Sequence, residues 1–159
     1  MNRYVVGVVV LVMVLVGVGL GVRHARRPVA PLISVAGHEG QATVPVAYGA
    51  PVDLRVGVTE PRYLYVFDRV GTEAPVLIWR SGPSDPPFEP GEYAADGEFG
   101  RRPGLHEVFA VASAAPQAHP EQWKTVDELK TCAGCGTASV TVLVAAPADG
   151  GGLYHGEAP

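Results

Sequence analysis

The most regular pattern in the chain is the segment Val52-Asp53-Leu54-Arg55-Val56-Gly57-Val58. Every second residue is apolar, and the residues between include Asp53 and Arg55. Because successive side chains of a β-strand point to opposite faces, the apolar residues lie on one face and the charged residues on the other. The segment is therefore predicted to be a strand with one face buried and the other in water.

Two more apolar segments follow and are expected to pair. Residues 62–68 read Arg-Tyr-Leu-Tyr-Val-Phe-Asp, and residues 75–80 read Pro-Val-Leu-Ile-Trp-Arg. Gly71 lies between them, where a turn tolerates a residue without a Cβ atom. A strand that is apolar on both faces is usually covered on both faces. We therefore expect a hairpin in the centre of the sheet.

Shorter segments extend the pattern. We predict strands at 91–93, 105–113 and 138–145 from their apolar and alternating residues. The stretch 81–104 contains five prolines and five glycines, which favours an extended surface loop around the first of these strands. Roughly seven or eight short strands in about 110 residues predict an all-β antiparallel sandwich of immunoglobulin-like size.

One helix is predicted between the last two strands. Pro120 stands at a first helical position, and Trp123, Val126 and Leu129 recur at helical spacing. Lys130 near the expected C-terminal end interacts favourably with the helix dipole. We expect this short helix to pack as a lid on the sheet.

The N-terminal stretch from Tyr4 to Val22 contains no charged residue. Its nineteen residues, at about 1.5 Å each, span roughly the hydrocarbon core of a bilayer. We predict a transmembrane helix at residues 4–22. A cleaved signal peptide is the alternative, but the apolar run is longer than a typical h-region. Moreover, Arg23-His24-Ala25-Arg26-Arg27 follows it instead of a small-residue cleavage site.

The predicted organisation after the anchor is a basic flank and linker at 23–41, a β-sandwich domain at 42–146 and a flexible tail at 147–159. Two arguments about orientation oppose each other. The three arginines behind the anchor favour a cytoplasmic domain by the positive-inside rule, whereas a very short N-terminal tail usually stays inside, which favours an exported domain. We expect a single-pass membrane protein whose domain lies outside the cytoplasm.

The charge of the domain argues against nucleic acid as a partner. The chain has twelve Lys and Arg, four of which flank the anchor, so eight remain against all sixteen Asp and Glu. Proteins that bind nucleic acid need clustered Lys and Arg to displace counterions from phosphates. We therefore predict no nucleic-acid partner.

Catalytic and metal-binding motifs are missing from the sequence. The pairs His38-Glu39 and His106-Glu107 begin a zinc-hydrolase motif, but Ala42 and Ala110 stand where its second histidine belongs. The serines lie outside the G-x-S-x-G frame of a nucleophile elbow, and dense glycine spacings occur in the anchor and the tail, where they form no phosphate loop. We predict no enzyme activity, no cofactor and no metal.

The segment Cys132-Ala133-Gly134-Cys135 is the one chemically suggestive motif. A thioredoxin-type pair has its first cysteine at a helix N-terminus after a strand, whereas this pair follows the predicted helix and precedes a strand. Structural zinc requires two further ligands. Three alternatives remain: a structural disulfide, free thiols, and metal or redox chemistry. We expect the disulfide, which is typical of an oxidising compartment.

The segments 52–56, 63–69, 76–79, 90–93 and 105–113 together resemble a bacterial domain family of unknown function. In that family a Tyr-Leu-Tyr-Val-Phe-Asp strand leads into a hairpin, and a Pro-Gly-Glu turn precedes a strand that ends in Ala-Ser. The resemblance covers about residues 45 to 115. Members resemble β-sandwiches and are often encoded near kinases or caspase-like peptidases, which implies an accessory or sensory role. No catalytic residues come with the family.

These observations lead us to expect a membrane-anchored, non-enzymatic β-sandwich that binds a protein partner at the cell envelope. Trp79, Phe88, Tyr93 and Trp123 are the candidate contacts, with core packing as the alternative for each. The alternative function is a thiol-redox or metal-dependent protein centred on the two cysteines.

Overall fold

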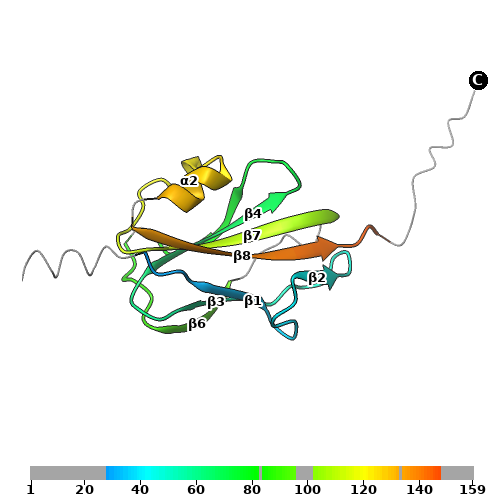
Figure 1. Ribbon diagram of the computed structural model, residues 1–159, viewed down its shortest axis with the longest axis horizontal. Helices are drawn as coiled ribbons and strands as arrows, with labels where there is room; N and C mark the ends of the chain where they lie inside the picture. Colours follow the sequence, from blue (N-terminus) through cyan, green and yellow to red (C-terminus); the bar gives the residue numbers. More distant parts are fainter. Residues whose placement is uncertain (1–27, 83, 96–101, 133, 148–159) are drawn as a thin grey trace, which may run out of the picture.

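The computed structural model describes residues 28–82, 84–95, 102–132 and 134–147. They form a mostly β structure with two sheets and a short α-helix, as the sequence predicts (Figure 1). The small sheet has the strand order β1-β3-β6, and the large sheet has the order β2-β8-β7-β4-β5. The strands are β1 (Leu32–Val35), β2 (Thr43–Val46), β3 (Leu54–Val58), β4 (Tyr63–Val70), β5 (Val76–Arg80), β6 (Gly91–Ala95), β7 (Gly104–Ser113) and β8 (Cys135–Val144).

The two sheets pack face to face around one hydrophobic core. Strand β3 contributes Leu54, Val56 and Val58, all buried, so the predicted half-buried strand is confirmed. Its outer side carries Arg55, whose guanidinium pairs with Asp53 at 2.7 Å. The period-two alternation of the sequence therefore determined which face of this strand is buried.

The large sheet has a second core on its outer face, where residues 117–131, called the covering segment below, lie over it (Figure 1). Strand β4 sends Leu64 and Val66 into the core between the sheets, and Tyr65 and Phe67 into the second core. Leu129 of the covering segment is fully buried there. The structure thus has three layers, which explains why β4 is apolar on both faces.

The helix begins later than Pro120 suggested. Residues Pro120–Gln122 form a 3-10 turn, η2, and the α-helix, α2, spans Val126–Thr131. Thr125 caps α2, because its hydroxyl accepts a hydrogen bond from the Glu128 N–H at 3.2 Å while the Glu128 carboxylate accepts from the Thr125 N–H at 2.8 Å. This capping box sets the start of the helix, and the predicted packing of α2 as a lid is confirmed.

Three expectations about the sheets were wrong. The predicted hairpin exists as β4 and β5, but β5 is an edge strand and the hairpin is not central. Strand β2 pairs with β8 in parallel, so the sandwich is not purely antiparallel. Strand β1 begins at Leu32, inside the predicted linker, so the sandwich starts before residue 42. Short edge strands such as β1 and β2 carry too few residues for a clear period.

Two predicted segments lie outside the described residues. These are the transmembrane helix at 4–22 and the tail from residue 148 onward. In the part of the chain that the structure describes, no helix is both long and apolar enough to cross a membrane.

Candidate functional site

Three of the four candidate contact residues form one aromatic cluster at an edge of the sandwich. The ring centroids of Trp79 and Phe88 lie 5.4 Å apart, and those of Phe88 and Tyr93 lie 4.5 Å apart. Trp79 comes from the large sheet and Tyr93 from the small sheet, while Phe88 exchanges backbone hydrogen bonds with Arg62. All three rings are half-buried against the core between the sheets. The cluster therefore closes the gap between β5 and β6.

Trp123, the fourth candidate, lies elsewhere. Its ring is 6.1 Å from that of Tyr65 and 5.7 Å from that of Phe67, in the core beneath α2. The structure does not bring the four aromatic residues together on one surface. Because each packs against a core, alanine substitution at any of them removes stability as well as exposed surface.

Cys132 and Cys135 form a disulfide at the junction of α2 and β8. The Cys135 N–H donates to the Cys132 carbonyl at 3.0 Å, and Gly134 supplies the positive φ of 77° in this tight turn. Cys132 follows the C-terminus of α2, where the helix dipole disfavours a thiolate, and Cys135 is 6% exposed. This placement is suited to a structural crosslink and is the reverse of a thioredoxin-type site.

A groove runs along the outer face of the large sheet, between the β4–β5 hairpin and the covering segment. Its wider part has a volume of about 650 Å³ and lies between residues 72–75 on one side and 124–127 on the other. A narrower part of about 410 Å³ continues along β5 beside Val76, Leu77 and Arg80. The two parts share Pro75 and Lys124 in their linings, so they adjoin each other, and we refer to them together as the groove.

The groove carries charges of both signs. On its floor Arg69 forms an ion pair with Glu107 and lies 5.8 Å from the centroid of the Phe109 ring. Two more charged residues, Asp127 and Lys130, line the wall formed by α2. Neither of these two has an ion-pair partner among the described residues, so both are available to a ligand in the groove.

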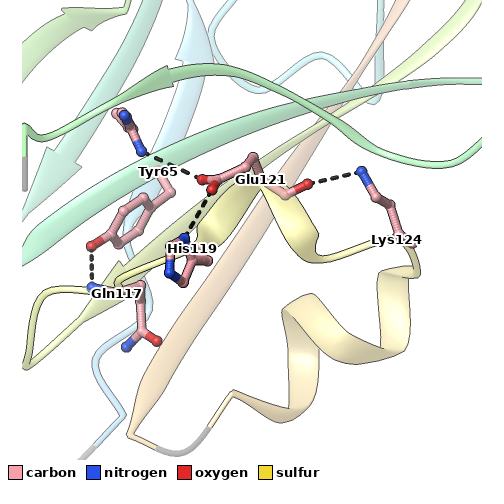
Figure 2. A network of polar contacts seen from close by, with 6 residues as sticks. Tyr65, Gln117, His119, Glu121 and Lys124 are labelled. Carbon is pink, nitrogen blue, oxygen red and sulfur yellow. Dashed lines mark hydrogen bonds and ion pairs between the residues drawn. The ribbon is translucent and has the colours of Figure 1, made fainter.

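A polar network holds the wall of the narrower part (Figure 2). Glu121 accepts from Arg80 at 3.5 Å and from the His119 imidazole at 3.2 Å. The Lys124 ammonium donates to the Glu121 carbonyl at 2.9 Å. The backbone N–H of Glu121 is the main cause that lowers the pKa of its carboxyl group, with His119 and Arg80 acting in the same direction. The carboxylate is thus held in its charged form at the rim.

Tyr65 links this wall to the sheet. Its hydroxyl accepts a hydrogen bond from the Gln117 N–H at 2.7 Å, and the side chain is buried beneath the loop (Figure 2). Burial raises the pKa of Tyr65, so the phenol stays protonated at neutral pH. The covering segment is therefore anchored by Tyr65 before η2 and by Leu129 within α2.

A second polar cluster lies inside the sandwich. The His106 Nδ1 is 2.9 Å from both carboxylate oxygens of Asp68, and its Nε2 is 2.7 Å from the carbonyl of Arg102. A carbonyl only accepts, so Nε2 carries a hydrogen and one proton is shared between Nδ1 and the carboxyl group. Burial is the main cause that raises the pKa of Asp68. Both side chains are buried, so this pair is placed to stabilise the fold.

The groove residues were not singled out from the sequence, because they belong to no motif. Their one local signal was the capping box of Thr125 and Glu128, which locates the helix that forms the wall. Among the described residues, no group of three or more His, Cys, Asp and Glu side chains is placed to hold a metal ion.

The chain matches no protein-family model, and comparison with curated proteins and with solved structures found no match.

Proposed function

We propose that this chain is a membrane-tethered, non-enzymatic β-sandwich module that binds a segment of a protein partner at the cell envelope. The observation that carries the proposal is the groove beside α2. It is elongated and partly apolar, and Asp127 and Lys130 on its wall are not neutralised by ion pairs within the described fold. Grooves of this kind accept extended or helical segments through apolar contacts, with charges selecting the partner.

The uncharged stretch 4–22 supports the tether in this proposal, and the disulfide supports a domain in an oxidising compartment. The accessory or sensory role follows from the family resemblance. Reporter enzymes fused behind Pro159, one active in the cytoplasm and one active outside it, test the orientation. Activity of the external reporter alone is expected, and activity of the cytoplasmic reporter alone contradicts the envelope location.

Site-specific photo-crosslinking of the full chain in its native membranes tests the groove. A photoreactive side chain replaces Val76, which is 55% exposed beside the groove. The matched control replaces Leu32, which is 70% exposed on the small sheet. We expect one discrete protein adduct from position 76 and none of that mass from position 32.

Charge variants then connect the adduct to the groove. Lys130→Glu reverses an unpaired charge on the wall, and Arg55→Glu reverses a charge on the outer side of β3. A contact of about 1.4 kcal/mol corresponds to a tenfold change in affinity, so the yield of the adduct should fall about tenfold in Lys130→Glu. The yield should stay unchanged in Arg55→Glu. Equal adducts from positions 76 and 32, or equal loss in both charge variants, would show that the groove is not the binding site.

A further inference from the structure

Strand β5 forms an open edge of the large sheet. Among the described strands it pairs with β4 alone, so its other side has no neighbouring strand. Residues 76–79 are all apolar, and Val76 is 55% exposed. Natural proteins protect such edges with proline, with charges or by keeping the strand very short, because an unprotected edge pairs with other chains. The open edge of β5 is therefore a surface on which a further strand can pair.

The other edges of the two sheets are less suited to pairing. Strands β1 and β2 have four residues each, and Pro45 in the middle of β2 has no N–H to donate. Strand β6 begins with glycine and carries the exposed charged residue Glu92. Strand β5 is thus the edge that offers an added strand the most apolar contact.

Hydrogen-bonding groups of the β5 backbone face the open side. The Ser81 N–H donates to the Leu64 carbonyl at 2.9 Å, so the backbone of Ser81 faces β4. In an antiparallel pair, successive residues face the partner strand and the opposite side in turn, so the N–H and C=O of Arg80 point away from β4. The irregularity in the register lies between Leu77 and Trp79 and leaves this alternation at Arg80 intact.

The two faces beside this edge are the groove and the aromatic cluster. On the outer face, Leu77 and Arg80 line the narrower part of the groove. Its wall carries Glu121 and Lys124 (Figure 2). On the inner face, Trp79 belongs to the aromatic cluster at the edge of the sandwich. Since side chains of a strand alternate between its faces, a strand laid against β5 places them in turn over the groove and over the cluster.

We infer that the partner segment binds in an extended conformation, as an added β-strand along β5, and not as a helix in the groove. The inference rests on the proposed function and specifies the form in which the partner binds. Backbone hydrogen bonds to Arg80 contribute binding free energy for any sequence, whereas the side chains over the groove and the cluster select the partner.

The charges of the groove define the chemistry of this segment. Three charged side chains of the groove lining have no ion-pair partner within the described fold, namely Lys124, Asp127 and Lys130. The excess of one positive charge favours a carboxylate among the side chains that face the groove. The expected partner segment therefore alternates apolar residues, which face the aromatic cluster, with a groove-facing set that includes Asp or Glu.

The test uses the full chain in its native membranes, with the photoreactive side chain at position 76. Arg80→Pro removes the N–H that faces the open edge, and an edge strand tolerates proline at such a position. Arg80→Ala is the matched control, because it removes the same side chain and its contact with Glu121 but keeps the N–H. Loss of this hydrogen bond leaves a partner carbonyl unsatisfied, so the adduct yield should be at least about fivefold lower in Arg80→Pro than in Arg80→Ala.

The outcomes separate this inference from the proposed function. Equal adduct yields in Arg80→Pro and Arg80→Ala would overturn the added strand, while the groove would remain the binding site. Absence of a discrete adduct from position 76 when Arg80 is unchanged would overturn the added strand and the proposed function together.

A second measurement does not depend on the proline variant. Photoreactive side chains at position 76 and at position 80, in separate chains, are mapped onto the partner by mass spectrometry. The two positions lie about 13 Å apart along β5, a distance that about four residues of extended chain or about nine residues of helix span. We expect attachment sites about three to five residues apart in one segment that contains Asp or Glu. Sites more than about six residues apart, or a segment without Asp or Glu, would overturn the inference.

Discussion

Replacement of Gly136 by alanine should destabilise the domain through a clash between two backbone segments. A Cβ atom at Gly136 would lie 2.1 Å from the carbonyl oxygen of Val29 and 2.5 Å from the amide nitrogen of Ala30. Carbon atoms approach such atoms to about 3.5 Å, so the segment that leads into β1 must move by more than about 1 Å. Neither partner is a side chain that can rotate away.

The magnitude follows from two opposing effects. Overpacking of this kind costs about 1–3 kcal/mol. Gly→Ala also restricts the unfolded chain, which raises the free energy of unfolding by about 0.4–1 kcal/mol. Gly57 of β3 provides the matched control, since its added Cβ atom would meet no atom closer than 3.5 Å. The effect on the unfolded chain is common to both variants and cancels, so we expect Gly136→Ala to be less stable than Gly57→Ala by about 1–3 kcal/mol.

Urea unfolding of the full chain in detergent micelles measures this difference. The emission of Trp79 and Trp123, the two tryptophans of the chain, follows the edge cluster and the core beneath α2. Hydrogen exchange should also be faster at residues 28–35 in Gly136→Ala alone. If the two alanine variants unfold within about 0.5 kcal/mol of each other, the close contact with Val29 does not exist in solution.

Further predictions concern the buried pair, the helix cap and the disulfide. Burial raises the pKa of Asp68. The stability that the protonated Asp68 carboxyl group contributes is therefore complete below the usual aspartate pKa and is lost as pH rises through the raised pKa. Asp68→Asn should remove this pH dependence in unfolding experiments from pH 4 to 8. His106→Ala leaves a buried carboxyl group without this partner and should cost about 1–3 kcal/mol, measured by urea unfolding at pH 7. Thr125→Ala removes the cap of α2 and should cost about 1 kcal/mol in the same assay. Replacement of both Cys132 and Cys135 by serine opens a short loop, with an expected cost of about 2 kcal/mol that a reducing agent should reproduce in the unmodified chain.

Each of these predictions has its own control. An asparagine at position 68 still donates to the His106 ring, so Asp68→Asn should cost clearly less than His106→Ala. The opposite order would show that the ionised carboxylate is needed. Thr125→Ser keeps the capping oxygen and should be near wild type, and equal losses in the serine and alanine variants would contradict the capping argument. A reducing agent should not change the stability of the double serine variant. If it does, its effect on the unmodified chain cannot be assigned to the disulfide.

Local sequence patterns predicted the long inner strands well. The alternation from Leu54 to Val58 located β3 and its buried face, and the apolar stretch 63–67 predicted a strand covered on both faces. These predictions succeeded because strand periodicity depends on neighbouring residues alone. The start of α2 was also present in the sequence, in the capping box of Thr125 and Glu128, but Pro120 drew the predicted start to the 3-10 turn before it.

The pairing of the strands could not be derived from local patterns. Strand β2 has four residues and contains Pro45, and it pairs in parallel with the far end of the chain in β8. Strand β5 reads as apolar as β4, yet it lies at an edge and carries an irregularity in its register opposite Val66 and Phe67. Which strands become neighbours depends on how the two sheets bury their apolar faces together. No short segment of sequence contains that information.

The sequence by itself determined the class of the domain, the uncharged N-terminal stretch and the cysteine pair, because each depends on residues adjacent in the chain. Tertiary structure alone decided the groove, whose walls come from residues 69–80 and 121–130, and the open edge of β5 beside it. It also decided that the aromatic candidates divide between two cores. The physical reason is that these features arise from contacts between segments that sheet pairing brings together. The periodicity within one segment carries no information about which other segments it meets.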